Sequence, residues 1–303
     1  MGAQLRAVRA RIRAVKSIAK ITRAQELIAS SRIVRAQQRT RAAEPYSREL
    51  TLAVEAVVSR STNVTHPMIT EPESKKRAAV VILTSDGGFC GAFNANVLRE
   101  ASRLRQRTTE DGITLLNYVA GRKGIAWHRF RELPLEAEWS GFSAQPSYAD
   151  AERIASALLD AFELDTANGG VDEIYLVSTE FVSMLTQRPA VRRLLPMEIE
   201  EKEGERPGGA LPSYEFEPSP DVVLDALLPQ YVASRVYYAM LEAAASELAA
   251  RRRAMKAATD NANDLIDRLT REANNARQAE ITQEISEIVG GANALAEANA
   301  GSE

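Results

Sequence analysis

Apolar residues recur at helical spacing over two stretches that are far longer than the helices of an ordinary globular core. Near the C-terminus the steps alternate between three and four residues, along Leu241, Ala244, Leu248, Arg251, Met255, Ala258, Ala262, Leu265 and Leu269. A comparable stripe near the N-terminus comprises Leu5, Val8, Ile12, Val15, Ile18, Ile21 and Ile28. This is the period of a coiled coil, so the sequence predicts two long helices that pair antiparallel and bracket a compact domain.

Two irregularities interrupt the C-terminal stripe. Arg251 occupies an apolar position, where a buried guanidinium is costly unless it is paired. Either the helix pair is open there or Arg251 contacts another molecule. We expect its replacement by a neutral residue to impair the function of the chain while barely lowering its stability; a large loss of stability would instead make Arg251 a member of a buried ion pair. After Leu269 the phase shifts, and the stripe resumes on a new face at Ile281, Ile285, Ile288, Ala292 and Leu295.

The first long helix is predicted at residues 4–58 and the last at residues 220–295. Pro45 lies inside the first, where it removes a backbone hydrogen bond and should kink or break the helix. Pro229 predicts a kink in the last helix, which begins after a capping candidate, Ser219.

The middle of the chain alternates short apolar runs with amphipathic stretches, which is typical of a parallel sheet covered by helices. The predicted strands cover residues 78–84, 113–120, 171–178 and 191–195, and the predicted helices cover residues 95–107, 123–131 and 148–164. The fold class is therefore α/β: a small Rossmann-like domain with a mostly parallel sheet, joined to a long antiparallel coiled coil. The predicted domains are the N-terminal helix at 1–60, the α/β domain at 75–205 and the C-terminal helix at 206–303.

Composition excludes several classes of protein. No apolar run reaches the roughly 18 residues that a membrane-spanning helix needs, and the N-terminus has no apolar signal region. The single cysteine, Cys90, excludes an internal disulfide framework, and with only His66 and His128 a His/Cys metal site is not expected. We expect a reducing compartment and read both histidines as surface or packing residues.

Charge is distributed very unevenly. The first 41 residues hold eleven Lys or Arg and one acid, a net charge of +10, and because the whole chain carries -3 the remainder carries -13. Such a basic helix suits nucleic acid, a membrane surface, an acidic protein or simply a solvated face. The aromatic residues that usually accompany nucleic-acid binding are missing, since the first one is Tyr46.

The most enzyme-like segment is the loop SDGGFCG at residues 85–91, which follows a predicted strand and precedes a helix. It matches neither GxGxxG nor GxxxxGK[ST], so it favours a tight turn over a phosphate-binding loop. Cys90 could be a nucleophile at a helix start, but neither histidine is near it in sequence, and a small buried cysteine is the more ordinary interpretation. A nucleotide-dependent enzyme and a nucleic-acid-binding coiled coil remain the alternative hypotheses.

Three segments resemble the gamma subunits of F-type ATP synthases. They are KITRAQELIASS at residues 20–31, MKAATDNA at 255–262 and ARQAEITQEISEIV at 276–289. The resemblance spans nearly the whole chain, and the ending GANAL together with Gln25 is similar to actinobacterial members. Many relatives have Met at Gln25 and Arg-Gly-Leu at residues 87–89, which leaves the contacts of those positions open.

The resemblance implies a central rotor shaft that couples ion-driven rotation of the membrane c-ring to ATP synthesis, or hydrolysis, in the beta subunits. Such a shaft is a non-catalytic subunit of an enzyme complex, so no catalytic residue, metal or cofactor is expected. The expected location is the cytoplasmic side of the cell membrane, as a peripheral protein without a transmembrane segment.

The resemblance also implies partners and contact residues. The partners are the alpha and beta subunits of the catalytic ring, the epsilon subunit and the c-ring, with no nucleic acid. By position in the family motifs, Arg251, Arg277, Gln278 and Thr282 are the expected beta-subunit contacts. Tyr214 and Glu217 are the expected c-ring contacts.

Overall fold

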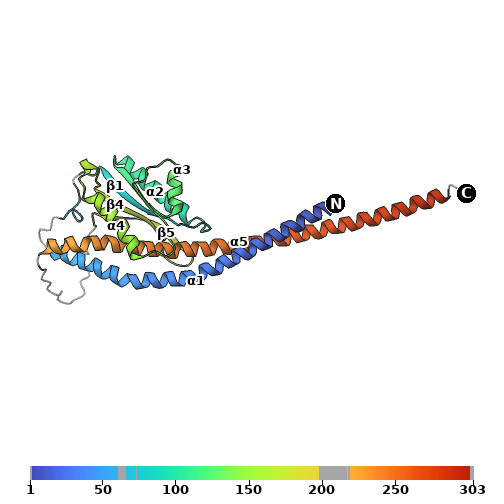
Figure 1. Cartoon of the computed structure of the whole chain (residues 1–303), viewed down its shortest axis with the longest axis horizontal. Coiled ribbons are helices and arrows are strands. Elements are labelled where there is room, and N and C mark those ends of the chain that lie inside the picture. The colour runs from blue at the N-terminus through green and yellow to red at the C-terminus, as the bar shows by residue number, and fades with distance from the viewer. Residues whose placement is uncertain (1, 61–65, 73, 198–216, 218, 301–303) are drawn as a thin grey trace. The chain divides into compact units, whose positions relative to one another are not determined.

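The computed structural model describes residues 2–60, 66–72, 74–197, 217 and 219–300 (Figure 1). The chain divides into two compact units. Unit 1 comprises Met1–Ile28 and Arg253–Glu303, and unit 2 comprises Ala29–Arg252. Two helices, α1 (Gly2–Arg60) and α5 (Pro220–Ala300), contribute to both units. The domain boundaries predicted at residues 60, 75 and 205 stay a prediction.

Unit 2 contains a five-stranded sheet with the strand order β3-β2-β1-β4-β5. The strands are β1 (Arg77–Leu83), β2 (Thr114–Ala120), β3 (Ala137–Trp139), β4 (Glu173–Phe181) and β5 (Gln187–Leu195). The first four run parallel, and β5 is antiparallel to β4. The predicted α/β class with a mostly parallel sheet is confirmed, as are the four predicted strands.

Three helices connect the parallel strands, namely α2 (Phe93–Glu110), α3 (Arg122–Phe130) and α4 (Tyr148–Glu163), and a 3-10 turn, η1 (Thr166–Asn168), precedes β4. All three helices were predicted. Ser147 caps α4, because its side chain accepts from the Asp150 amide while the Asp150 carboxylate accepts from the Ser147 amide.

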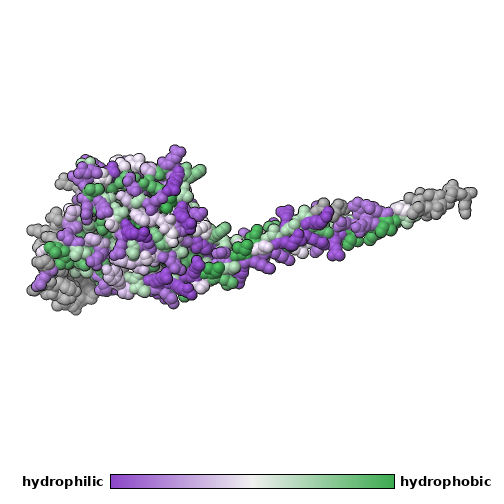
Figure 2. Space-filling view, in the orientation of Figure 1, coloured by the Kyte–Doolittle hydropathy of each residue, from purple (hydrophilic) through white to green (hydrophobic). Residues whose placement is uncertain are grey.

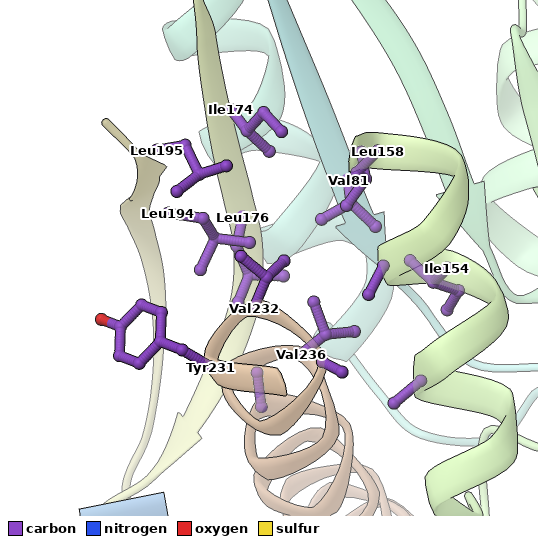
Figure 3. Close-up of a cluster of buried hydrophobic side chains, with 14 of the residues drawn as sticks. Val81, Ile154, Leu158, Ile174, Leu176, Leu194, Leu195, Tyr231, Val232 and Val236 are labelled. Carbon is purple, nitrogen blue, oxygen red and sulfur yellow. The ribbon is translucent and has the colours of Figure 1, made fainter. Parts of the chain in front are cut away.

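Side chains of β1 alternate between two cores, as the period of a strand requires. Val81 faces α4 and α5, where Ile154 and Leu158 of α4 meet Val232 and Val236 of α5 (Figure 3). Other members of this core are Ile174, Leu176, Leu194, Leu195 and Tyr231. The long helix α5 is therefore an integral part of one layer of the α/β unit.

The opposite face of the sheet packs against α2 and α3. Val80 and Ile82 of β1 are fully buried there against Val97 of α2 and Ile125 of α3. The result is the three-layer arrangement expected of a parallel sheet.

Unit 1 is a helix pair. Leu5 and Val8 of α1 pack against Leu269 and Ala273 of α5, and the hydroxyl of Thr22 lies 2.7 Å from that of Thr259. Because α1 residue numbers rise as α5 numbers fall, the pair is antiparallel, which confirms the predicted coiled coil.

The N-terminal stripe follows a different course from the one predicted. Ile18, Ile21 and Ile28 are 52%, 61% and 44% exposed, whereas Thr22 and Glu26 are buried. The buried positions keep steps of three and four residues, and the expected stripe left this register after Val15. A polar residue can take a place in the helix pair when it is bonded there, as Thr22 is to Thr259.

The break expected at Pro45 is also absent, because α1 is helical through it. Pro45 and Arg41, whose carbonyl the proline leaves without an amide partner, both lie on the exposed side of the helix. Water can bond that carbonyl, so the cost of the proline is small there. In the part of the chain that the structure describes, none of the helices has the length and apolarity that crossing a membrane demands.

Candidate functional site

The carboxyl edge of the sheet is covered by α5. In doubly wound sheets this edge, near the point where strand order reverses, is the usual ligand crevice. Here Arg251 of α5 donates from Nε and Nη2 to the carbonyl of Gly88, at 3.3 and 3.2 Å, and Ser246 donates to the carbonyl of Thr179 in β4 at 3.4 Å. Side chains of α5 therefore occupy part of this crevice, and a pocket of about 20 Å³ remains beside Glu247.

Arg251 is held from its own helix as well. Its Nη2 lies 2.6 Å from Oε1 of Glu247, one turn earlier, and the two side chains are 15% and 2% exposed. Burial raises the pKa of Glu247, and the nearby Arg251 opposes that rise. This pairing favours the alternative that Arg251 is a member of a buried ion pair, whose loss would lower stability, and the effect of replacing it stays a prediction.

Asp86 ties together the three loops at this edge. Its carboxylate accepts from the amides of Arg122, Gly141 and Ser143 at 3.1, 2.8 and 3.0 Å. Burial opposes ionisation of Asp86, but the backbone donors outweigh it and the pKa lies below its ordinary value. The arrangement orders loops without presenting a reactive group to solvent.

The Arg251 guanidinium lies directly against the loop at residues 85–91, which already satisfies it through the carbonyl of Gly88. A Cβ at Gly87 would meet Nη2 of Arg251 at 2.9 Å. Cys90 is 3% exposed, and Asn94 donates to its sulfur at 3.3 Å. Both observations favour the tight-turn interpretation over the nucleotide-dependent enzyme.

A second candidate surface lies on the last part of α5, in unit 1. Arg277, Gln278 and Thr282 are all exposed there. The hydroxyl of Thr282 donates a hydrogen bond to the carbonyl of Gln278 at 2.9 Å. Their functional groups lie on neighbouring turns of one helix. Arg251 is not among them, because it belongs to unit 2.

Apolar residues share this part of α5. Ile281, Ile285, Ile288 and Val289 are 46%, 56%, 71% and 53% exposed. Figure 2 shows green, hydrophobic atoms exposed along the extended part of α5. The resumed stripe thus has no covering partner within the described residues, and large apolar side chains in such a row mark an interaction surface.

Comparison with known proteins identifies the family. The ATP synthase family model matches residues 4–295. An ATP synthase gamma chain of Thermobifida fusca is 57% identical over 100% of both chains, and one of Acidothermus cellulolyticus is 59% identical over 97% of this chain and 98% of its own. The chain belongs to the ATP synthase gamma-chain family. The predicted resemblance to actinobacterial members is confirmed.

Solved structures share the fold of this gamma-family chain. A chain from the Euglena gracilis mitochondrial ATP synthase, in a structure of its OSCP, F1 and c-ring, has a TM-score of 0.68 at 17% identity and covers 97% of this chain and 95% of its own. A chain from the central stalk and c-ring of the Tetrahymena thermophila enzyme has a TM-score of 0.56 at 22% identity and covers 78% and 99%. The long helices with an attached α/β unit are therefore a known arrangement.

The remaining predicted site residues of this gamma-family chain are only partly visible. Glu217 is exposed, and Tyr214 lies outside the described residues. His66 bonds Asp225 at 3.1 Å, and His128 is fully buried with Nδ1 2.9 Å from the carbonyl of Gly124. Burial lowers the pKa of His128. Among the described residues, no cluster of His, Cys, Asp or Glu could hold a metal ion.

Sequence reasoning missed the buried acids of α5. Glu242 and Glu247 are 9% and 2% exposed. The spacing of Glu247 and Arg251 by four residues is a signal for the second of them, since such residues are neighbours on a helix. Glu242 has no comparable local signal, because its nearest cation, Arg192, comes from β5.

Proposed function

We propose that this chain is the central rotor shaft of an F-type ATP synthase, in which it couples ion-driven rotation of the c-ring to ATP synthesis or hydrolysis in the beta subunits. It is a non-catalytic subunit of that complex. Its action is mechanical. A helix that contacts the neighbouring subunits differently on its different sides favours different conformations of those subunits as it turns.

One observation carries the proposal beyond family membership. The last part of α5 continues past the helix pair with an exposed apolar row, Ile281, Ile285, Ile288 and Val289. Burial of such side chains is worth roughly 2 kcal/mol each, which a partner surface would recover. A ring formed by alpha and beta subunits is the surface that we propose for it.

The beta-subunit contacts that we propose are Arg251, Arg277, Gln278 and Thr282. The last three are exposed on α5 beside the apolar row, which supports them. Arg251 is engaged with Glu247 and Gly88, so a beta-subunit carboxylate would have to compete with those bonds.

At the other end of the coupling we propose Tyr214 and Glu217 as c-ring contacts, and the epsilon subunit as a partner of the α/β unit. The chain would then act as a peripheral protein on the cytoplasmic side of the cell membrane. Exposure of Glu217 is compatible with its role.

The test is reconstitution of the complex in vesicles with and without the chain. We expect ion-driven ATP synthesis only with the chain present, and no ATP turnover by the purified chain alone. Turnover by the chain alone, or undiminished coupled synthesis without it, would overturn the proposal.

A further inference from the structure

A groove in unit 2 runs between α1 and α5 and encloses about 320 Å³. Its lining residues are Glu44, Ser47, Arg48, Thr51 and Leu52 from α1, and Arg235 and Tyr238 from α5. It belongs to neither surface discussed above. Two guanidinium groups from different helices thus border one hollow.

In the part of the chain that the structure describes, these two arginines differ from Arg188 and Arg192 in their bonding. Arg188 and Arg192, on β5, both pair with Glu180, at 2.7 and 2.6 Å. Within the residues that the structure describes, no hydrogen bond or ion pair engages Arg48 or Arg235. Arg235 is also partly buried, and its charge acts on the buried carboxylate of Glu242, where it opposes the rise in pKa that burial causes, without a direct hydrogen bond to it among the described residues.

The groove offers a neutral donor beside the two cations. Thr51 already donates its hydroxyl hydrogen to the carbonyl of Ser47 at 2.8 Å. The phenol of Tyr238 is protonated at neutral pH, as its ordinary pKa of 10.0 requires, and burial together with the acids Glu242 and Glu44 raises that pKa further. An acceptor group in the groove could therefore bond both guanidinium groups and the phenol.

Charge and polarity select the kind of acceptor. With two arginines and Glu44, the lining carries a net charge of +1, which suits a single carboxylate better than a phosphate dianion. Leu52, 46% exposed, adds an apolar edge that a free ion would leave uncovered. Arginines that meet carboxylates form strong bidentate bonds and are frequent anchors of protein interfaces.

We propose that this groove binds the carboxylate of an Asp or Glu side chain from a partner polypeptide in the assembled complex. The inference rests on the proposed function only in requiring that a complex forms. Arg48 and Arg235 hold the carboxylate from two sides, Tyr238 donates to it, and the partner's flanking apolar atoms cover Leu52.

The experiment replaces Leu52 with photoreactive p-benzoylphenylalanine in the full chain, purifies the complex, irradiates it and identifies the linked peptide by mass spectrometry. We expect a partner peptide with an Asp or Glu beside the linked residue. We also expect Arg48→Gln with Arg235→Gln to lower the yield about tenfold, as loss of charged hydrogen bonds would.

The matched control is Arg35→Gln with Arg99→Gln, which removes the same charge from exposed positions outside the groove and should leave the yield unchanged. No linked partner, a peptide without an acid, or equal loss in both double variants overturns the inference. So does binding of inorganic phosphate by the isolated chain tighter than about 100 μM that the groove variant abolishes, because the groove would then serve a free anion.

Failure of this inference is distinguishable from failure of the proposed function. A complex that contains the chain and makes ATP, yet gives no link from position 52, rejects the groove alone. A chain absent from every active complex rejects the rotor proposal, and the groove proposal with it.

Discussion

The hydroxyl oxygens of Thr22 and Thr259 lie 2.7 Å apart in the buried interface between α1 and α5, although 237 residues separate them in the chain. Thr259 also lies within bonding distance of the Met255 carbonyl, at 2.9 Å, and Thr22 of the Ala19 carbonyl, at 3.1 Å. One hydroxyl can therefore donate to the other while the second donates to its own helix. This bond makes a polar position tolerable inside the helix pair.

Replacing Thr22 with Val is expected to destabilise the pair by about 1 kcal/mol, because Thr259 loses one partner and keeps another. The double variant Thr22→Val/Thr259→Val should cost less than the sum of the two single changes, since no unpaired hydroxyl remains. Native-state hydrogen exchange of α1 amides measures the effect. Thr270→Val, at an exposed position on α5, is the control, and a cost equal to that of Thr22→Val would contradict the prediction.

Replacing Arg251 with Met is expected to lower the free energy of unfolding by about 3 kcal/mol, because the buried carboxyl of Glu247 loses its guanidinium partner and must either stay ionised unpaired or take up a proton. Adding Glu247→Gln should recover much of the loss. Urea unfolding of the isolated chain followed by circular dichroism measures both. Lys256→Met removes the exposed pair with Asp260 and should cost less than about 0.5 kcal/mol.

If Arg251→Met is instead as harmless as Lys256→Met, the bond to Glu247 contributes little. A defect of that variant in coupled synthesis would then point to a direct contact with a partner. The two measurements together separate a packing role from a contact role.

Two glutamates beside Arg192 should respond to pH in opposite ways. Burial raises the pKa of Glu242, Arg192 opposes this and Glu180 adds to it, so ionisation of Glu242 costs stability as pH rises through its folded pKa. Glu242→Gln should therefore stabilise the chain at pH 7 by about 1 kcal/mol. The gain should disappear below the ordinary pKa of 4.5.

For Glu180 burial also opposes ionisation, but hydrogen bonds from Arg188 and Arg192 outweigh it and lower the pKa. Its contribution to stability is complete above pH 4.5 and is lost as pH falls through the folded pKa. Glu180→Gln should cost about 2 kcal/mol at pH 7 and nothing in strong acid. Unfolding series from acid to neutral pH test both variants, and curves of the same sign would refute the assignment.

The apolar row of α5 should matter for assembly and not for folding. Ile281→Ser with Ile285→Ser should leave the melting temperature of the isolated chain within about 1 °C, since both side chains are exposed. The same variant should lower the yield of assembled complex. Leu269→Ser, at 3% exposure, is the opposite control and should destabilise the isolated chain by about 3 kcal/mol.

The α/β unit was largely predictable, because buried strands such as β1 and amphipathic helices such as α4 impose clear local periods. The three-residue strand β3 was not predicted, since so short a segment holds no period. The full length of β5 was also missed, because its arginines make the segment look too polar for a strand in the sequence. Only the folded chain brings acids from β4 and α5 close enough to neutralise them.

The long helices were predictable in extent and only partly in register. Isoleucine is more apolar than threonine. The apolar pattern therefore assigned Ile18 and Ile21 to the buried stripe in place of Thr22. What decided the register was a bond to Thr259, which no local pattern contains. The candidate site shows the same limit: Arg251 stood out as misplaced, but its partner Gly88 could be found only in three dimensions.

The arginine that closes the carboxyl edge of the sheet also has a meaning for protein engineering. A Rossmann-like sheet invites the grafting of a nucleotide-binding loop, and Gly87 and Gly88 look like a convenient start. Such a graft would have to displace the guanidinium of Arg251 and free the carboxylate of Glu247, both of which belong to an 81-residue helix. New cofactor chemistry in this scaffold would therefore have to begin with the redesign of α5, before any change to the loop.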